Sequence, residues 1–260
     1  MKKSALVLSG GASLGAAHIG ALQVLEKKYT FDFLAGVSAG AIVAAAFACG
    51  KTAEQIAKEL YKQSFFHLGL DFTRSSFGIL QGTKILEVLN KFFENKNFED
   101  LHPHKKLMIG TTDFQTGERV IITSGNIAEA VRASISLPVI FEPFLHQGRW
   151  LIDGGVAQNF PLDLAIEHYE GDHIIGIDVA TCFSRDFDFT EKRIFRKLSH
   201  IHLILERTLR IFFKNQEKFP IDERVKIIRP SLQDFHGLDV LRLKEIENAG
   251  REAAEKMNTA

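Results

Sequence analysis

The stretch FLAGVSAGAIVAAAF, which spans Phe33–Phe47, places a serine between two glycines where an apolar run meets an alanine-rich run. The apolar run predicts a strand over 31–36, and the alanine-rich run predicts a helix over 39–49 that Gly50 ends. A strand, G-x-S-x-G and a helix in this order are typical of a nucleophile elbow, a sharp turn that presents Ser38 at the end of a strand and the N-terminus of a helix. The alternative is an N-capping serine in a glycine-rich turn, because G-x-S-x-G alone is a weak signal.

Strand and helix patterns alternate along the rest of the chain, which predicts an α/β fold in three layers, α/β/α, with a mostly parallel central sheet. No repeat, low-complexity tract or linker interrupts the pattern, so we expect a single domain over residues 1–260. The expected strands are 5–9, 31–36, 107–113, 119–123, 150–152, 173–179 and 225–229, and the expected helices are 16–28, 39–49, 53–63, 83–95, 127–134, 161–168, 191–218 and 241–257.

The composition is that of a soluble globular protein with balanced charge. Lys and Arg number 32, as do Asp and Glu, so no overall positive charge favours binding to nucleic acid, and we expect no such partner. Two cysteines, Cys49 and Cys182, offer no disulfide framework, which favours a reducing compartment. No apolar run approaches the ~18 residues of a membrane span, and the run after the N-terminal lysines is too short for a signal peptide. We therefore expect a cytoplasmic protein, and the oligomeric state stays open.

A nucleophilic serine needs a base, and the sequence offers one strong candidate. None of the ten histidines has a recognisable catalytic context; His18, in the first helix, is expected to be packed. The H-x-H pair His102 and His104 lacks a third ligand at a suitable spacing, so no metal site is expected. Asp153, in WLIDGGVAQNFP, ends an apolar strand and precedes two glycines. Such a strand end is where α/β sheets place active-site groups, although an ordinary Asp-Gly turn is the alternative.

These segments together resemble the patatin-like phospholipase family. A glycine loop, GGASLG at 10–15, follows the first strand, G-x-S-x-G follows the second, and D-G-G stands far downstream, in the family's order. Other segments similar to the family are GILQGTKILEVL (78–89), NFEDL (97–101), TTDFQTGERV (111–120) and VRASISLPVIFEP (131–143). The resemblance covers a motif-bearing part at about 4–180 and is looser in a C-terminal helical part at about 190–260. It implies a patatin-like form of the α/β/α fold.

The resemblance implies a serine acyl hydrolase, of the phospholipase A, lysophospholipase or lipid esterase type, that uses a Ser-Asp dyad without cofactor or metal. Ser38 would be the nucleophile and Asp153 the general base, and water would release the fatty acid from an acyl-enzyme. Backbone N–H groups of the oxyanion hole would come from Gly10, Gly11, Ala12 and Ala39. The motif glycines are Gly15, Gly36, Gly40, Gly154 and Gly155. A phosphate-binding loop is the alternative for 10–15, but the Lys-Ser/Thr ending of a P-loop is missing.

Two residues depart from the family's pattern. Ala12 stands where the family usually has a third glycine, and Leu14 stands where it usually has Arg or Lys. If residue 12 needs a positive φ, alanine carries a strain of about 1 kcal/mol. The departures predict slow hydrolysis or a neutral ester substrate. Two further hypotheses stay open: acyl transfer to an alcohol or thiol in the same site, and a lipid-binding regulatory protein that has lost activity.

Two segments are candidates for contact with lipid. The helix expected at 191–218 carries an apolar stripe with eight cations and three acids, so it can lie on the inner face of a membrane as a peripheral contact, or it can pack on the sheet. The apolar, aperiodic segment Phe65–Leu80 can line an acyl pocket, form a lid or be a buried irregular connection.

Overall fold

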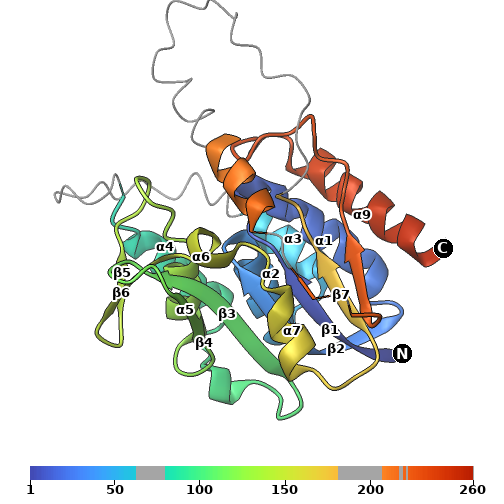
Figure 1. Cartoon of the computed structure of the whole chain (residues 1–260), viewed down its shortest axis with the longest axis horizontal. Coiled ribbons are helices and arrows are strands. Elements are labelled where there is room, and N and C mark those ends of the chain that lie inside the picture. The colour runs from blue at the N-terminus through green and yellow to red at the C-terminus, as the bar shows by residue number, and fades with distance from the viewer. Residues whose placement is uncertain (63–79, 181–206, 217–218, 221, 260) are drawn as a thin grey trace, which may run out of the picture.

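The computed structural model describes residues 1–62, 80–180, 207–216, 219–220 and 222–259. In this part of the chain an eight-stranded sheet has the order β5-β6-β3-β2-β1-β7-β8, with β4 paired to β3 (Figure 1). The strands are β1 (Lys2–Leu8), β2 (Tyr29–Val37), β3 (Lys106–Asp113), β4 (Arg119–Ile122), β5 (Phe144–His146), β6 (Arg149–Asp153), β7 (Ile174–Ile177) and β8 (Val225–Ile228).

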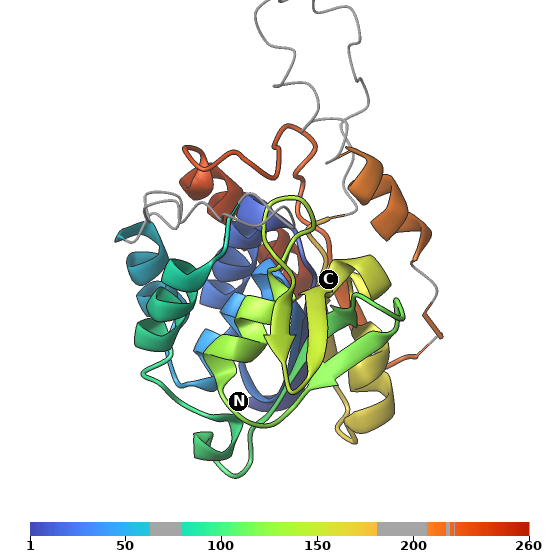
Figure 2. The same ribbon diagram turned by 90° about the vertical axis from the view of Figure 1, so that its left-hand side faces the viewer.

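Strands β1, β2, β3, β7 and β8 pair with one another in parallel. Strands β4 and β6 pair antiparallel to β3, and β5 pairs antiparallel to β6 and so runs in the same direction as β3. Helices cover both faces of the sheet: Figure 2 shows α1 to α4 on one side, in blue to teal, and α7 on the other, in yellow. The prediction of a three-layer α/β/α fold with a mostly parallel sheet is confirmed. The helices are η1 (Ala12–Gly15), α1 (Ala16–Leu25), α2 (Ala39–Ala48), α3 (Ala53–Lys62), α4 (Thr83–Phe92), η2 (Phe98–Asp100), α5 (Ile127–Ser134), α6 (Gly155–Gln158), α7 (Leu162–His168) and α9 (Leu243–Thr259), with a further helix at 207–215.

The central strand β1 shows why its sequence is apolar without alternation. Leu6 and Leu8 pack into the core under α1 and α2, whereas Ala5 and Val7 pack into the core under α7. A strand with helices on both faces buries every side chain, and the last five residues of β1 are all buried. The carboxyl ends of β1 and β2 are therefore held rigidly, and both lead into the loops of the candidate site.

The pairing of β3 brings two distant strands end to end. Ile109 and Gly110 pair with β2 and also with β4, whereas Thr111 and Thr112 pair with β4 and also with β6. Because a strand has only two sides, β2 and β6 lie one after the other on the same side of β3. Val37 pairs with Gly110 and Asp153 pairs with Thr111, so the end of β2 meets the end of β6.

Several expected elements differ from the structure or lie outside the described residues. The strand β5 was not predicted, because three residues with one exposed leucine give no pattern; it forms a hairpin with β6 across Gln147 and Gly148, both at positive φ. The helix expected at 16–28 ends at Leu25, and the one expected at 83–95 ends at Phe92. The basic helix expected at 191–218 lies mostly outside the described residues. Of Phe65–Leu80, the structure describes only Leu80.

Candidate active site

The turn between β2 and α2 holds Ser38 in an unusual backbone conformation. Its φ is 52° and its ψ is −122°, a sparsely populated region that persists only where the surroundings enforce it. The surroundings here are backbone: a Cβ at Gly40 would lie 2.5 Å from the Leu8 carbonyl oxygen, and a Cβ at Gly36 would lie 2.6 Å from the Gly40 carbonyl oxygen. Only glycine fits at either position, so the two glycines of G-x-S-x-G allow the strand and the helix to pack this closely.

The Ser38 side chain is directed at a carboxylate. Its Oγ donates a hydrogen bond to Oδ2 of Asp153, at 2.7 Å, and it makes no capping hydrogen bond to α2. The N-cap alternative is therefore not what the structure shows. Asp153 is the last residue of β6 and is 4% exposed, and its Oδ1 accepts the N–H of Gly155 at 2.8 Å. The two side chains that the sequence analysis selected, 115 residues apart, thus meet.

Burial changes the acidity of this carboxyl group. Desolvation raises the pKa of Asp153 to about 6, while the hydrogen bonds from Ser38 and Gly155 oppose that rise by favouring the carboxylate. A carboxylate with a pKa near neutrality is both ionised at pH 7 and basic enough to accept a proton.

The glycine loop lies beside the elbow and is fastened by distant parts of the chain. Ala12 has a φ of 50°, so the residue that stands in place of a glycine does adopt the conformation that glycine favours. The Gly10 N–H donates to the carbonyl oxygen of Asn159, and the Ser13 N–H donates to that of Gly237. The Gly10 N–H is therefore already engaged, and the expected set of oxyanion donors narrows to Gly11, Ala12 and Ala39, which line the same cavity as Ser38.

His18 forms a hydrogen bond with the residue that precedes the glycine loop. It is fully buried in α1, and its Nε2 lies 2.8 Å from the carbonyl oxygen of Ser9. Burial lowers the pKa of His18 to about 4, so the ring is neutral at pH 7 and Nε2 carries the proton that is donated to Ser9. The expectation that this histidine is packed is confirmed.

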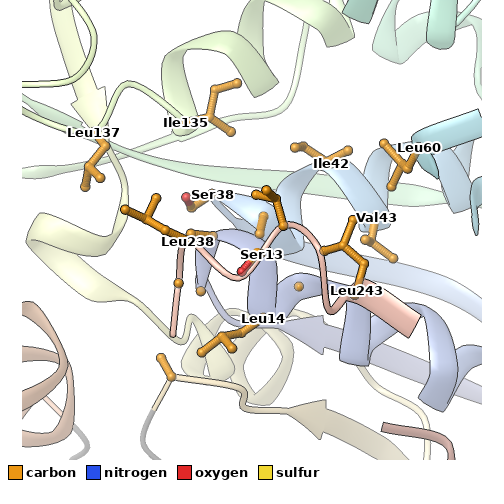
Figure 3. Close-up of a pocket in the computed structure, with 18 of the residues that line it drawn as sticks. Ser13, Leu14, Ser38, Ile42, Val43, Leu60, Ile135, Leu137, Leu238 and Leu243 are labelled. Atoms are coloured by element: carbon orange, nitrogen blue, oxygen red, sulfur yellow. The ribbon is translucent and has the colours of Figure 1, made fainter. Parts of the chain in front are cut away.

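A largely apolar cavity of about 740 Å³ opens in front of Ser38 (Figure 3). In Figure 3, Ile135 and Leu137 lie toward one side, and Ile42, Val43 and Leu60 lie toward the other. Leu14, which replaces the family's cation, is 1% exposed and forms part of the wall. Among the described residues, the cations of the lining are Arg210 from the 207–215 helix, Arg242 just before α9 and Lys244 in its first turn. The volume is within the range of small-ligand sites.

The remaining expected site residues lie where the motifs put them. Gly15 ends η1, where a Cβ would lie 2.7 Å from the Cβ of Ala39; Gly154 and Gly155 begin the turn into α6 after Asp153. His102 and His104 lie together in a loop, and among the described residues no group of three His, Cys, Asp or Glu side chains could hold a metal ion. Within the described ranges, no helix is long and apolar enough to span a membrane.

Three comparisons define the family. The family model for patatin-like phospholipases matches residues 6–166, so the chain belongs to that family. It is 30% identical to an uncharacterized NTE family protein of Mycobacterium bovis over 96% of this chain and 45% of that protein. It is 33% identical to the neuropathy target esterase sws of Drosophila melanogaster over 68% of this chain and 13% of that protein. The chain thus spans less than half the length of these relatives. Among solved structures, VipD from Legionella pneumophila shares the fold, with a TM-score of 0.62 and 16% identity over 98% of this chain and 66% of VipD.

The sequence analysis did not single out three residues that hold the site together through hydrogen bonds. Ser134 and Ser136 contact the backbone of the elbow and of Asp153, and Asn159 binds the glycine loop. All three lie in segments that resemble the family, VRASISLPVIFEP and DGGVAQNFP. Their partners lie 96, 17 and 149 residues away, so spacing alone could not reveal these contacts.

Proposed function

We propose that this chain is a serine acyl hydrolase that cleaves fatty-acyl esters of lipids through a Ser38–Asp153 dyad. The single observation that carries the proposal is the 2.7 Å hydrogen bond from the Ser38 hydroxyl to a buried carboxylate whose pKa is raised to about 6. A serine hydroxyl is a weak nucleophile until a base accepts its proton, and Asp153 is placed to accept it. The membership in the patatin-like phospholipase family and the esterase relative support the same class of reaction.

The reaction proceeds in two halves. Ser38 Oγ attacks the ester carbonyl carbon while its proton passes to Asp153 Oδ2, and the resulting oxyanion is held by the N–H groups of Gly11, Ala12 and Ala39. The tetrahedral intermediate collapses, the alcohol leaves with the proton from Asp153, and the acyl group stays on Ser38. Water then attacks the acyl-enzyme, Asp153 takes its proton, and the second collapse releases the fatty acid and returns the proton to Ser38.

The cavity favours an acyl chain as the group that is bound. Its walls are mostly aliphatic, and burial of each methylene is worth about 0.8 kcal/mol. Leu14 contributes carbon rather than charge to the glycine loop, which favours a neutral ester over a substrate whose phosphate needs a cation at that position.

Apolar side chains at the opening of the cavity favour contact with a lipid surface. Leu238 and Leu241 line the cavity and are also 53% and 94% exposed, so they lie at its rim. Exposed leucines beside Arg242 and Lys244 suit an anionic membrane surface. We therefore include in the proposal a peripheral contact with the membrane, made by this rim together with the basic stretch at 191–218. We also propose that residues 1–260 form a single catalytic domain.

The test is fatty-acid release by the purified chain from three substrates: a monoacylglycerol, a lysophosphatidylcholine, and phosphatidylcholine vesicles. We expect release by the wild type and none above background by Ser38→Ala, a change that removes one partly buried hydroxyl from the wall of the cavity and leaves the fold intact. Release that persists in Ser38→Ala would contradict the assignment of the nucleophile. Fatty acid that binds without turnover would favour the lipid-binding hypothesis, and product shifted by added alcohol would favour acyl transfer.

A further inference from the structure

The carboxyl end of α5 inserts a side chain between β2 and β3 where the two strands separate. The Ser38 N–H donates to Ser134 Oγ at 2.9 Å, and the Ser134 hydroxyl in turn donates to the Gly110 carbonyl oxygen at 2.7 Å. Ser134 is fully buried. One hydroxyl thus satisfies one donor and one acceptor of two neighbouring strands.

The position of this bridge explains how the elbow leaves the sheet. The last β2–β3 pair is Val37 with Gly110, so the next N–H along β2 is that of Ser38 and would otherwise bond within the ladder. With Ser38 at a φ of 52°, the hydroxyl of Ser134 takes up that N–H and passes the hydrogen bond on to Gly110. A buried N–H or C=O without a partner is strongly disfavoured, so the bridge stabilises the elbow in the conformation that aims Ser38 Oγ at Asp153.

The same helix end also holds the other half of the dyad. The Asp153 N–H donates to the carbonyl oxygen of Ser136 at 2.9 Å, two residues beyond Ser134. Arg132, 1% exposed, binds the Ser136 hydroxyl through Nη1 at 2.6 Å and the carbonyl oxygens of Gln81 and Gly82 through Nη2 and Nε. The segment 134–136 is therefore fixed by a buried guanidinium while it bonds to the backbone of both Ser38 and Asp153.

We propose that Ser134 is a positioning residue for the acylation step: its hydroxyl fixes the backbone of the nucleophile so that Ser38 Oγ stays on Asp153. This inference rests on the proposed function. Ser134 takes no part in proton transfer, since its hydroxyl proton is donated in the hydrogen bond to the Gly110 carbonyl oxygen. Its removal therefore leaves Asp153 buried and bonded to the Gly155 N–H but lets the nucleophile move. A misplacement of about 1 Å lowers a rate by on the order of 100-fold.

The experiment compares Ser134→Ala and the near-isosteric Ser134→Cys with a control at the other end of α5, Asn126→Ala. Asn126 Oδ1 caps the helix by accepting the Glu129 N–H at 3.0 Å, so its loss weakens the same helix without touching the elbow. The readouts are the pre-steady-state burst with a p-nitrophenyl acyl ester, its pH profile, the thermal midpoint, and hydrogen exchange of the Ser38 amide by NMR.

We expect Ser134→Ala to acylate about 10- to 100-fold more slowly and to expose the Ser38 amide to rapid exchange. The substrate dissociation constant, read from the concentration dependence of the burst, should stay nearly unchanged, and the pH midpoint should stay or rise slightly, because the Ser38 hydrogen bond that favours the carboxylate is weakened. Ser134→Cys, a weaker hydrogen-bonding group, is expected between Ala and wild type. Asn126→Ala should lower the thermal midpoint and keep the burst rate. The inference is overturned by a burst in Ser134→Ala within twofold of wild type, or by an equal rate loss in Asn126→Ala. A wild type that releases no p-nitrophenol overturns the proposed function, and this inference with it.

Discussion

The elbow at 36–40 and the glycine loop at 10–15 each hold a non-glycine residue at positive φ, Ser38 at 52° and Ala12 at 50°, but they are held by different means. The elbow is fixed by backbone packed on backbone, with no room for a Cβ at Gly36 or Gly40. The loop is fixed by hydrogen bonds to Asn159 and Gly237, which arrive from much later in the chain. Ser38 is therefore held by close backbone packing together with the Ser134 hydroxyl, whereas the glycine loop is held by hydrogen bonds to the backbone of Asn159 and Gly237.

Gly40→Ala breaks the elbow side of the comparison. The new Cβ would lie 2.5 Å from the Leu8 carbonyl oxygen and 2.6 Å from that of Ser9, and neither backbone group can move without shifting β1. We expect the free energy of unfolding to fall by about 3 kcal/mol or more and activity to be lost, as measured by urea unfolding and fatty-acid release.

Gly125→Ala is the control for that change. Gly125 has a φ of 81° with open space around its Cα, so alanine there adds backbone strain without a clash. We expect a loss of only about 1 kcal/mol and full activity. Equal losses in the two variants would show that strain, and not close packing, sets the tolerance of the elbow.

Asp153→Asn tests whether the carboxylate that faces the elbow acts as the base for Ser38. Asparagine can still accept the Gly155 N–H and reach Ser38, but it cannot take the proton, so we expect kcat to fall by roughly 10³- to 10⁴-fold. The raised pKa means that the folded state favours the protonated acid, so ionisation destabilises the wild type as pH rises from about 4 through 6. Above pH 6, Asp153→Asn should therefore have a free energy of unfolding up to about 3 kcal/mol larger than that of the wild type, and a higher thermal midpoint. Retained activity in this variant would refute the role of Asp153 as base.

The pH dependence of the wild type measures the same carboxylate without a substitution. Since Asp153 must be ionised to accept the proton, kcat/KM should fall about tenfold per pH unit below pH 6 and level off above it. A profile that keeps rising through pH 8 would point to a different base.

Ala12→Gly sharpens the loop side and has the smallest expected effect. It removes strain at a φ of 50° but gives the unfolded chain more freedom, so stability should change by less than about 1 kcal/mol. If Ala12 keeps the proposed oxyanion donors away from their optimal positions, the glycine variant should acylate a few-fold faster than the wild type. A fall in rate would instead show that the alanine keeps the loop ordered.

The sequence predicted best those elements whose structure is decided by the residues within them. The elbow, the strand before Asp153 and α5 were predicted closely; α5 spans 127–134 as expected, and its cap, Asn126, is seen only in the structure. The short strand β5 and the early end of α1 at Leu25 were not, because hairpin pairing and tertiary packing decide them.

The site could be predicted only in part for the same reason. Motifs identified Ser38 and Asp153, but not that β3 brings β2 and β6 end to end, which follows from strand pairing between distant segments. The hydrogen bond from the Gly10 N–H to Asn159 is likewise a long-range contact, and it removes Gly10 from the N–H groups that the proposed oxyanion hole could use. A pattern names the residue types; the pairing of strands decides which of them meet.

The most direct test of the dyad is reaction with a fluorophosphonate probe, read by intact mass and by mapping of the modified peptide. The wild type should gain one adduct, on Ser38; Ser38→Ala should gain none, and Asp153→Asn should react far more slowly. A folded wild type that gains no adduct, or one that is modified on another residue, would contradict the account.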